Sequence, residues 1–499
     1  MNSRTKNVKL NIIYGYAAQV GIIILSFIGR KIFLHFLSAD YLGINGLYSN
    51  ILTILSLAEL GLDTAVIYSL YKPIAECDTK LIHSLLIYFR KLYTILAISI
   101  FAIGVAIVPF LNYLVKSDLQ QKDLVIYYLL FLANSVSSYF VAHKVALLSA
   151  SQEQRVQKLV TLSFSLVLQI VHIGVLLVWK SYYAYIITTV LNTVMTKIVL
   201  GIVADKLHPE VRNETEIVSF DKKPIIERMF STFLYKIGAV LINSTDNILI
   251  SVLVSTVAVG YYSNYYTVVS ALTGFIAIIT TSLIAGVGNL ATKGKHKEQS
   301  DLFDMMLFFY HTIAAMGLVG FSLLFNHLIS VWLGNQYLFD NKTVFVIALN
   351  FYISNAISPV WMFREANGLF KKVRYILLVR AALNIVFSIW FGIVWGVFGI
   401  FLATAVSLVL TNFWLEPKIV SKEVLHRPLR VYWLKQLKYL LITVVCYAIS
   451  YSLIKRLGDS ILMLAIKALI IIVITGGVFI LVNYRTAELK KLRGYLLKK

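Results

Sequence analysis

About fourteen long apolar stretches follow one another along this chain, with polar gaps between them. A helix needs about 20 apolar residues to cross the roughly 30 Å hydrocarbon core of a bilayer, and the stretches have this length. Strict alternation of apolar and polar positions, which a membrane β-barrel would show, is absent. The pattern therefore predicts membrane-spanning helices over residues 10–37, 43–71, 85–112, 123–149, 158–179, 182–204, 229–254, 258–288, 302–329, 341–366, 373–393, 395–416, 435–455 and 460–484.

The first six stretches are echoed by the next six about 216 residues later. Six spans are an even number, so both halves insert in the same orientation, and a pseudo-two-fold axis is expected along the membrane normal. We therefore expect an all-α polytopic membrane protein, with two six-helix lobes and a C-terminal helix pair. The matched positions are Asn134 with Asn350, Ser138 with Ser354, Ala150 with Ala366, Trp179 with Trp395, and Thr188 with Thr404.

Two polar, proline-containing gaps suggest where the chain divides. The gap at 205–228 contains Pro209 and Pro224, and the gap at 416–435 contains Pro417 and Pro428. These gaps predict an N-terminal lobe, an inter-lobe linker, a C-terminal lobe, a second linker and a final helix pair with a basic tail. The predicted boundaries are 1–205, 206–228, 229–416, 417–434 and 435–499.

Composition supports the membrane assignment. Hydrophobic residues make up 59% of the 499 positions and charged residues only 14%, whereas soluble proteins carry about 25% charged residues. One alternate set of gaps, together with both termini, holds about 34 of the 46 Lys and Arg residues, and the other set holds about six. This positive-inside asymmetry predicts cytoplasmic termini. The net charge of +22 is then explained by basic helix ends, and no nucleic-acid partner is expected.

The chain lacks the motifs of an enzyme. It has no H-E-x-x-H or G-x-S-x-G motif and no Cys/His metal set, and the run from Gly288 to Lys295 is followed by His296 where a P-loop needs Ser or Thr. The external gaps, at most about thirteen residues long, have no room for a catalytic domain. We expect no enzymatic activity, metal or cofactor, and transport coupled to a proton or Na⁺ gradient instead of to ATP.

Charged and polar residues inside the apolar stretches are the candidate site. A charge at mid-bilayer costs about 2.5–3.5 kcal/mol on insertion scales, so each such residue suggests a function. Helical spacing puts Gln19 and Arg30 on one face of the first span, and Lys236, Asn243 and Asp246 on one face of the seventh. Snorkelling of the side chain to the membrane interface could instead explain Arg30. A structural salt bridge could explain Glu59 and Asp63 in the second span. The other candidates are Glu59, Asp63, Asn134, Asn350, Ser354 and Arg380.

Spans one and seven differ in charge at matched positions. At the repeat offset Arg30 falls on Asp246, and we predict that these two residues pair when the outer gate is closed. Cationic groups in a cavity without a nucleotide site suit an anionic substrate, such as a diphosphate or an acidic sugar, because charge-assisted hydrogen bonds hold such groups strongly.

Six runs of the sequence carry a family resemblance: 30–34, 40–52, 57–61, 245–250, 259–262 and 395–400. They resemble bacterial polysaccharide-unit flippases of the multidrug/oligosaccharidyl-lipid/polysaccharide (MOP) flippase superfamily. The resemblance implies alternating access and transfer of an undecaprenyl-diphosphate-linked oligosaccharide to the outer leaflet of the bacterial plasma membrane, for capsule, O-antigen or exopolysaccharide synthesis. It also implies that Arg30, Lys236 and Arg380 contact the diphosphate, and that a polymerase and glycosyltransferases act in the same pathway. A lipid II flippase or multidrug exporter of the same superfamily is the alternative.

Overall fold

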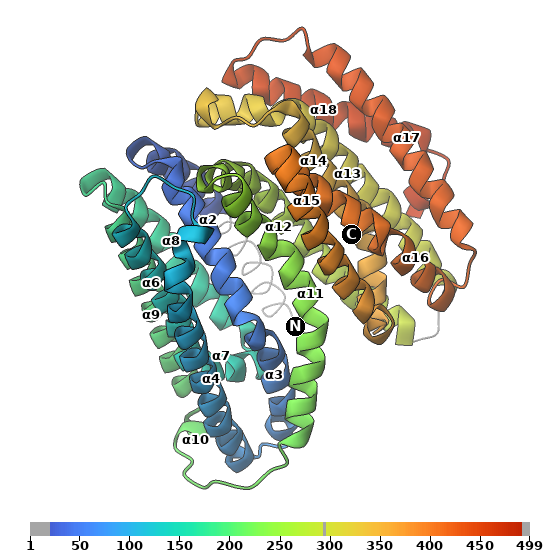
Figure 1. The fold of residues 1–499 in the computed structure, drawn as a ribbon. Helices are drawn as coiled ribbons and strands as arrows, with labels where there is room; N and C mark the ends of the chain where they lie inside the picture. The colour runs from blue at the N-terminus through green and yellow to red at the C-terminus, as the bar shows by residue number, and fades with distance from the viewer. Residues whose placement is uncertain (1–19, 293–295, 492–499) are drawn as a thin grey trace, which may run out of the picture. The chain divides into compact units, whose positions relative to one another are not determined.

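The computed structural model describes residues 20–292 and 296–491, and all regular secondary structure within them is helical (Figure 1). This confirms the all-α prediction. Ten helical stretches in these residues are long and apolar enough to cross a membrane. The protein is therefore a multi-pass membrane protein.

The helices fall into two compact units, residues Met1–Gly260 and Tyr261–Lys499. In the first unit a helix over 20–36 precedes α2 (Ala39–Leu55), η1 (Ser56–Ala58), α3 (Glu59–Ala75), α4 (Thr79–Ile107), η2 (Val108–Phe110), α5 (Leu111–Leu114), α6 (Gln121–Ser137), η3 (Ser138–Val141), α7 (Ala142–Ala150), α8 (Gln154–Val178), α9 (Tyr182–Leu207), α10 (Pro209–Arg212) and α11 (Lys223–Leu253). Next come α12 (Thr256–Thr292), which begins in the first unit, α13 (His296–Trp332), η4 (Asn335–Tyr337), α14 (Asn341–Ala366), α15 (Phe370–Leu410), α16 (Asn412–Glu423), α17 (Leu429–Ile454) and α18 (Ile461–Val482).

Ten candidate spans stand against fourteen predicted stretches, and two local features account for two of the four that are missing. The 3-10 turn η1 divides the predicted second span into α2 and α3. Conversely, α15 joins the predicted spans 373–393 and 395–416 through a kink at Gly396, whose φ of 62° and ψ of −138° are not helical. Glycine tolerates positive φ because it has no Cβ. A Cβ on the nearby Gly399 would lie 2.0 Å from the Phe391 carbonyl oxygen, so the two arms pack closely at this turn.

The unit boundary at Gly260 falls one helix later than the predicted start of the second lobe. Within the first unit α11 packs against α2 and α3. The predicted linker 206–228 contains α10 and the beginning of α11, and hydrogen bonds hold it to the start of α4. His83 Nδ1 lies 3.0 Å from the Val211 carbonyl oxygen, and the Val218 amide donates to Ser84 Oγ over 2.8 Å. The division into lobes and linkers stays a prediction.

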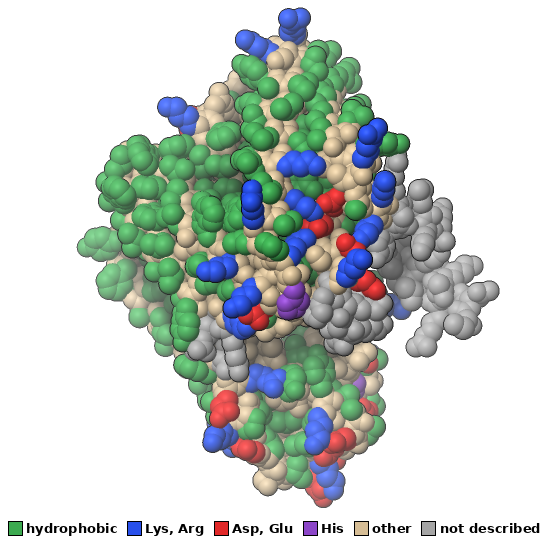
Figure 2. Space-filling view, turned by 90° about the vertical axis from the view of Figure 1, so that its right-hand side faces the viewer, with side chains coloured by type: hydrophobic (Ala, Val, Ile, Leu, Met, Phe, Trp, Pro, Cys, Tyr) green, Lys and Arg blue, Asp and Glu red, His purple; other side chains and the backbone are tan. Residues whose placement is uncertain are grey.

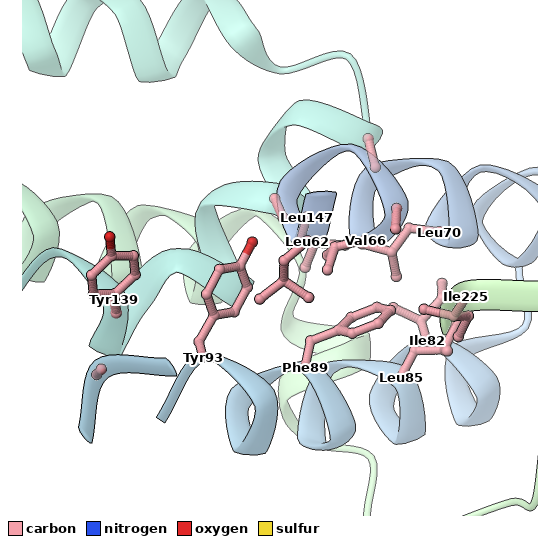
Figure 3. Packing of buried hydrophobic residues seen from close by; sticks show 14 of the residues in the cluster. Leu62, Val66, Leu70, Ile82, Leu85, Phe89, Tyr93, Tyr139, Leu147 and Ile225 are labelled. Carbon is pink, nitrogen blue, oxygen red and sulfur yellow. The ribbon is translucent and has the colours of Figure 1, made fainter. Parts of the chain in front are cut away.

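One apolar cluster in the interior of the first unit is built mainly from α3 and α4 (Figure 3). Leu62, Val66 and Leu70 recur every four residues on α3, and Phe89 and Tyr93 face them from α4. Lipid chains are as apolar as these side chains, so the cluster is stabilised by van der Waals packing and not by removal from water. Tyr93 and Tyr139 belong to this cluster and carry hydroxyl groups into it.

Apolar side chains cover much of the outer surface, as lipid contact requires. Figure 2 shows one face on which hydrophobic side chains form broad areas and charged side chains gather in smaller groups. On α17 the exposed residues Leu434, Leu437, Leu441 and Val444 follow the helical repeat. This stripe identifies a lipid-facing side of α17.

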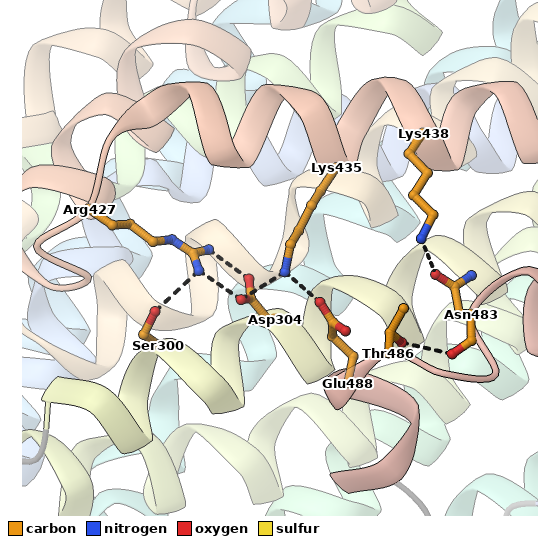
Figure 4. A network of polar contacts seen from close by, with 8 residues as sticks. All are labelled: Ser300, Asp304, Arg427, Lys435, Lys438, Asn483, Thr486 and Glu488. Carbon is orange, nitrogen blue, oxygen red and sulfur yellow. Dashed lines mark hydrogen bonds and ion pairs between the residues drawn. The ribbon is translucent and has the colours of Figure 1, made fainter.

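A polar network ties α13, α17 and the segment after α18 together (Figure 4). Arg427 binds Asp304 through two nitrogens at 2.7 and 2.8 Å, and Lys435 lies 2.8 Å from Asp304 and 2.6 Å from Glu488. Burial acts to raise the pKa of Glu488, but the hydrogen bonds from Lys435 and the backbone outweigh burial and lower this pKa from its ordinary value. The final helix pair is therefore fastened to α13.

Candidate functional site

Two carboxylates at the beginning of α3 are held by tyrosine hydroxyls. The Tyr139 hydroxyl, from η3, donates to Glu59 Oε2 over 2.7 Å, and the Tyr93 hydroxyl, from α4, donates to Asp63 Oδ1. A spacing of four residues places both acids on one face of α3. Both tyrosines are almost fully buried, so each carboxylate is oriented by a rigid neutral partner.

A lysine from α11 lies beside this acidic pair. Lys236 Nζ donates to Thr64 Oγ1 over 3.0 Å, next to Asp63 on α3. The charges of Asp63, Lys197 and Lys236 all act on Glu59. Three predicted site residues, Glu59, Asp63 and Lys236, are thus brought together, and Lys197 joins them from α9.

Glycines allow α2 and α3 to approach α11 and the start of α12 closely. A Cβ on Gly61 would lie 2.2 Å from the Met229 carbonyl oxygen, and one on Gly43 would lie 1.9 Å from that of Thr256. Gly260 comes equally near Ala39, with 2.2 Å between its Cβ position and the Ala39 carbonyl oxygen. Small residues permit such backbone contact between membrane helices. Two of the runs that resemble the family, the one with Gly43 and the one with Gly260, therefore pack against each other.

The C-terminal end of α11 is hydrogen-bonded to the end of α5 and to the residues that follow it. Ser251 Oγ donates to the Leu114 carbonyl oxygen over 2.7 Å, and the Thr256 amide donates to the Lys116 carbonyl oxygen over 3.0 Å. The hydroxyls of Ser251 and Thr256 are 2.7 Å apart.

Arg30 and Asp246, the predicted gate pair, are both half-buried in the first unit. Arg30 lies on the helix over 20–36, and its charge acts on Tyr185 of α9. The Tyr185 ring stacks on His172 with centroids 3.7 Å apart. Asp246 lies on α11, on the same helix as Lys236. Their pairing stays a prediction.

The second unit holds a different charged centre, between α14 and α16. Arg364 Nη1 binds both oxygens of Glu416, at 3.0 and 2.9 Å, and both side chains are buried. Arg364 Nη2 also lies 3.2 Å from Glu365, and Asn412 donates to Glu416. The charge of Arg380, which is buried on α15, acts on Glu416 as well.

The remaining predicted residues are separate from both centres or lie outside the described part. Asn350 Nδ2 donates to the Phe401 carbonyl oxygen over 2.8 Å and joins α14 to α15. The Ser354 carbonyl oxygen accepts from Ser358 within α14. The Asn134 amide oxygen is buried and has no hydrogen-bond partner among the described residues. Gln19 and the Asn243 side chain lie outside the described residues.

Sequence reasoning missed the residues that orient these charges. Tyr93, Tyr139 and Thr64 sit in ordinary-looking helical positions, and nothing in their local sequence singles them out. Glu416 could have been found, because Asn412 and Glu416 are four residues apart at the end of an apolar stretch. Within the described residues no group of three or more His, Cys, Asp or Glu side chains could hold a metal ion.

Comparison with known families decides where the chain belongs. A family model described as "Polysaccharide biosynthesis protein" matches residues 8–285, more than half of the chain. The chain belongs to the polysaccharide biosynthesis protein family. In this family member the match includes α2, α3 and α11, which carry the packed glycines and the cluster of Glu59, Asp63 and Lys236.

Solved structures show the same fold as this polysaccharide biosynthesis family member. The lipid II flippase MurJ, in an inward closed conformation, has a TM-score of 0.70 at 16% identity, over 95% of this chain and 99% of that chain. An inward-facing MATE-family multidrug resistance transporter of the MOP superfamily has a TM-score of 0.61 at 12% identity, over 80% and 94%. A MATE transporter from Vibrio cholerae has a TM-score of 0.53 at 13% identity, over 85% and 99%. A comparison with curated proteins gave no match by sequence.

Proposed function

We propose that this protein flips undecaprenyl-diphosphate-linked oligosaccharide units from the inner to the outer leaflet of the bacterial plasma membrane. The units would serve capsule, O-antigen or exopolysaccharide assembly. Glycosyltransferases would act before the transfer and a polymerase after it. Both termini would lie in the cytoplasm, and the protein would transport without enzymatic activity. The family assignment supports a role in polysaccharide synthesis, and the transporter fold supports translocation.

The observation that carries this proposal is Lys236 on α11 beside the acids of α3, in a protein of the polysaccharide biosynthesis family. A cation kept inside an apolar helix bundle is costly, so its presence argues for a use. Lys236, with Arg30 and Arg380, would contact the diphosphate through charge-assisted hydrogen bonds. Asn134 and its repeat partner Asn350, with Ser354, would face the sugar hydroxyls.

Alternating access would take its energy from a proton or Na⁺ gradient. Glu59 and Asp63 are the groups we assign to this coupling, because a carboxylate inside the membrane can change its proton or cation when its surroundings change. When the outer gate closes, Arg30 would pair with Asp246. Flipping at full rate in liposomes without any ion gradient would contradict the coupling but not the cargo assignment.

Reconstituted protein and a defined lipid-linked oligosaccharide test the cargo proposal. Losing one charge-assisted hydrogen bond costs about 1.5–3 kcal/mol, so Lys236→Ala is expected to slow flipping by about 10- to 100-fold. Lys342→Ala, which removes an exposed lysine at the beginning of α14, is the matched control and should flip at the wild-type rate. Wild-type flipping by both Lys236→Ala and Arg30→Ala would refute the proposal.

Lipid II is the second candidate cargo. The fold match to a lipid II flippase over nearly the whole of both chains favours it. The same liposomes loaded with lipid II distinguish the two cargoes, since a lipid II flippase would move it faster than the oligosaccharide lipid. A multidrug exporter would move neither lipid.

A further inference from the structure

A cavity of about 290 Å³ opens between α4, η3, α7 and α9 of the first unit. None of the residues assigned above to cargo or gating lines it. Three charged side chains do: Arg90 from α4, Lys144 from α7 and Asp205 from α9. Two cations and one carboxylate leave the cavity with an excess of positive charge.

The polar groups of the cavity are arranged to accept an anion. Lys144 Nζ lies 2.6 Å from Asp205 Oδ2, which fixes the lysine at the wall. His143, beside it, is only 7% exposed, and its Nδ1 has no hydrogen-bond partner among the described residues. Arg90 is exposed at the rim. A buried ring nitrogen without a partner is costly, and an oxygen-rich ligand at this place would satisfy it.

An apolar stripe on α9 leads to the cavity. Ile187, Leu191, Met195, Ile198 and Ile202 are all exposed, and intervals of three or four residues place them on one helical face. The last two, Ile198 and Ile202, also line the cavity together with Phe140. Fifteen residues of helix extend about 22 Å, which is more than the roughly 15 Å thickness of one leaflet's hydrocarbon.

We propose that this cavity binds the phosphate group of an anionic phospholipid, with one acyl chain lying along the α9 stripe. Arg90, Lys144 and His143 would hold the phosphate oxygens by charge-assisted hydrogen bonds. The cavity residues border the gaps at 72–91, 144–158 and 205–228, which are rich in Lys and Arg, so the lipid would come from the cytoplasmic leaflet. Basic pockets between membrane helices on that side are known to bind anionic headgroups. A free phosphate would share the headgroup contacts but would leave the apolar stripe unused.

Native mass spectrometry of the full-length protein, titrated with phosphatidylglycerol or with inorganic phosphate, tests the site. The wild type should retain one tightly bound phosphatidylglycerol, and Arg90→Ala combined with Lys144→Gln should weaken its binding by about tenfold or more. The matched control is Lys91→Ala, which removes the neighbouring exposed lysine of α4 without touching the cavity. It should bind phosphatidylglycerol as the wild type does.

A second variant addresses the acyl contact without altering the ion pair. Leu191→Glu puts a charge on the part of the apolar stripe that does not line the cavity, and it should weaken phosphatidylglycerol binding without changing that of inorganic phosphate. Equal lipid binding by the wild type and all variants would overturn the proposal. So would inorganic phosphate binding that depends on Arg90 while lipid binding does not, because the ligand would then be the free anion.

Discussion

Each of the two units has a charged centre among its helices, and the two centres differ in the groups that donate hydrogen bonds to their carboxylates. In the second unit, Glu416 meets the Arg364 guanidinium with both oxygens and also accepts from Asn412. In the first unit, Glu59 and Asp63 accept hydrogen bonds from the neutral hydroxyls of Tyr139 and Tyr93. Glu416 has its charge compensated by direct contact, whereas the two acids on α3 do not receive such contact from these hydroxyls.

Under the proposed function, this difference separates a structural ion pair from a site that exchanges a proton or cation. A buried carboxylate that binds a guanidinium through both oxygens loses much if either partner changes. A carboxylate held by a hydroxyl keeps its orientation in either protonation state, because the hydroxyl can donate to it or accept from it. We therefore propose that Arg364 and Glu416 serve the stability of the second unit, and that Glu59 and Asp63 serve the proposed transport.

The largest expected effect comes from breaking the structural pair. Arg364→Ala leaves Glu416 as a buried charge without its guanidinium, which is expected to cost about 3–5 kcal/mol of stability. The exposed pair Lys372–Glu423, 2.7 Å apart, is the matched control, and Lys372→Ala should cost less than about 1 kcal/mol. Thermal unfolding of the detergent-solubilised variants measures both. Equal losses would erase the proposed difference between buried and exposed pairs.

The converse substitution tests the functional centre. Glu59→Gln keeps the shape and an oxygen acceptor for Tyr139, so we expect stability to change by only about 1 kcal/mol. Because the carboxylate can no longer exchange a proton or cation, flipping driven by an ion gradient should fall by about tenfold or more. Glu416→Gln is the comparison. This variant should lose stability, whereas its transport rate per folded molecule should change little. The comparison fails if Glu59→Gln unfolds the protein as readily as Glu416→Gln.

Much of the architecture could be predicted from apolar periodicity, and the pairing of charges could not. The stretches at 123–149, 182–204 and 341–366 lie within continuous described helical segments, because length and composition alone determine such helices. The partners of the acids are distant in sequence: Tyr139 is 80 residues from Glu59, Tyr93 is 30 from Asp63, and Glu416 is 52 from Arg364. Helical spacing shows which face a residue occupies, but not which helix packs there.

The glycine contacts show how α11 comes close to Glu59 and Asp63. Filling one of them is expected to have an effect on stability smaller than that of Arg364→Ala. Gly61→Ala would place a Cβ against the Met229 carbonyl oxygen, and overpacking of this kind costs about 1–3 kcal/mol. It should also move Lys236 away from α3 and slow flipping. Gly174→Ala on α8 is the control, since nothing lies within 4 Å of its Cβ position. A stabilised Gly61→Ala variant would show that α11 does not approach α3 this closely.

The smallest expected effect is a pH dependence of the network at Glu488, which resembles the structural pair but lies nearer to water. Its carboxyl has a lowered pKa in the folded protein, against an ordinary value of 4.5. A lowered folded pKa contributes stability that is complete above the unfolded pKa and is lost as pH falls through the folded one. Melting temperatures measured from pH 6 down to about pH 3 should therefore fall less in Glu488→Gln than in the wild type. Glu76→Gln, at an exposed carboxylate, should follow the wild type. If Glu488→Gln melts with the wild-type pH dependence, the charge of Glu488 does not contribute to the stability of the final helix pair. The network would then resemble the Arg364–Glu416 pair in its geometry but not in its energetics.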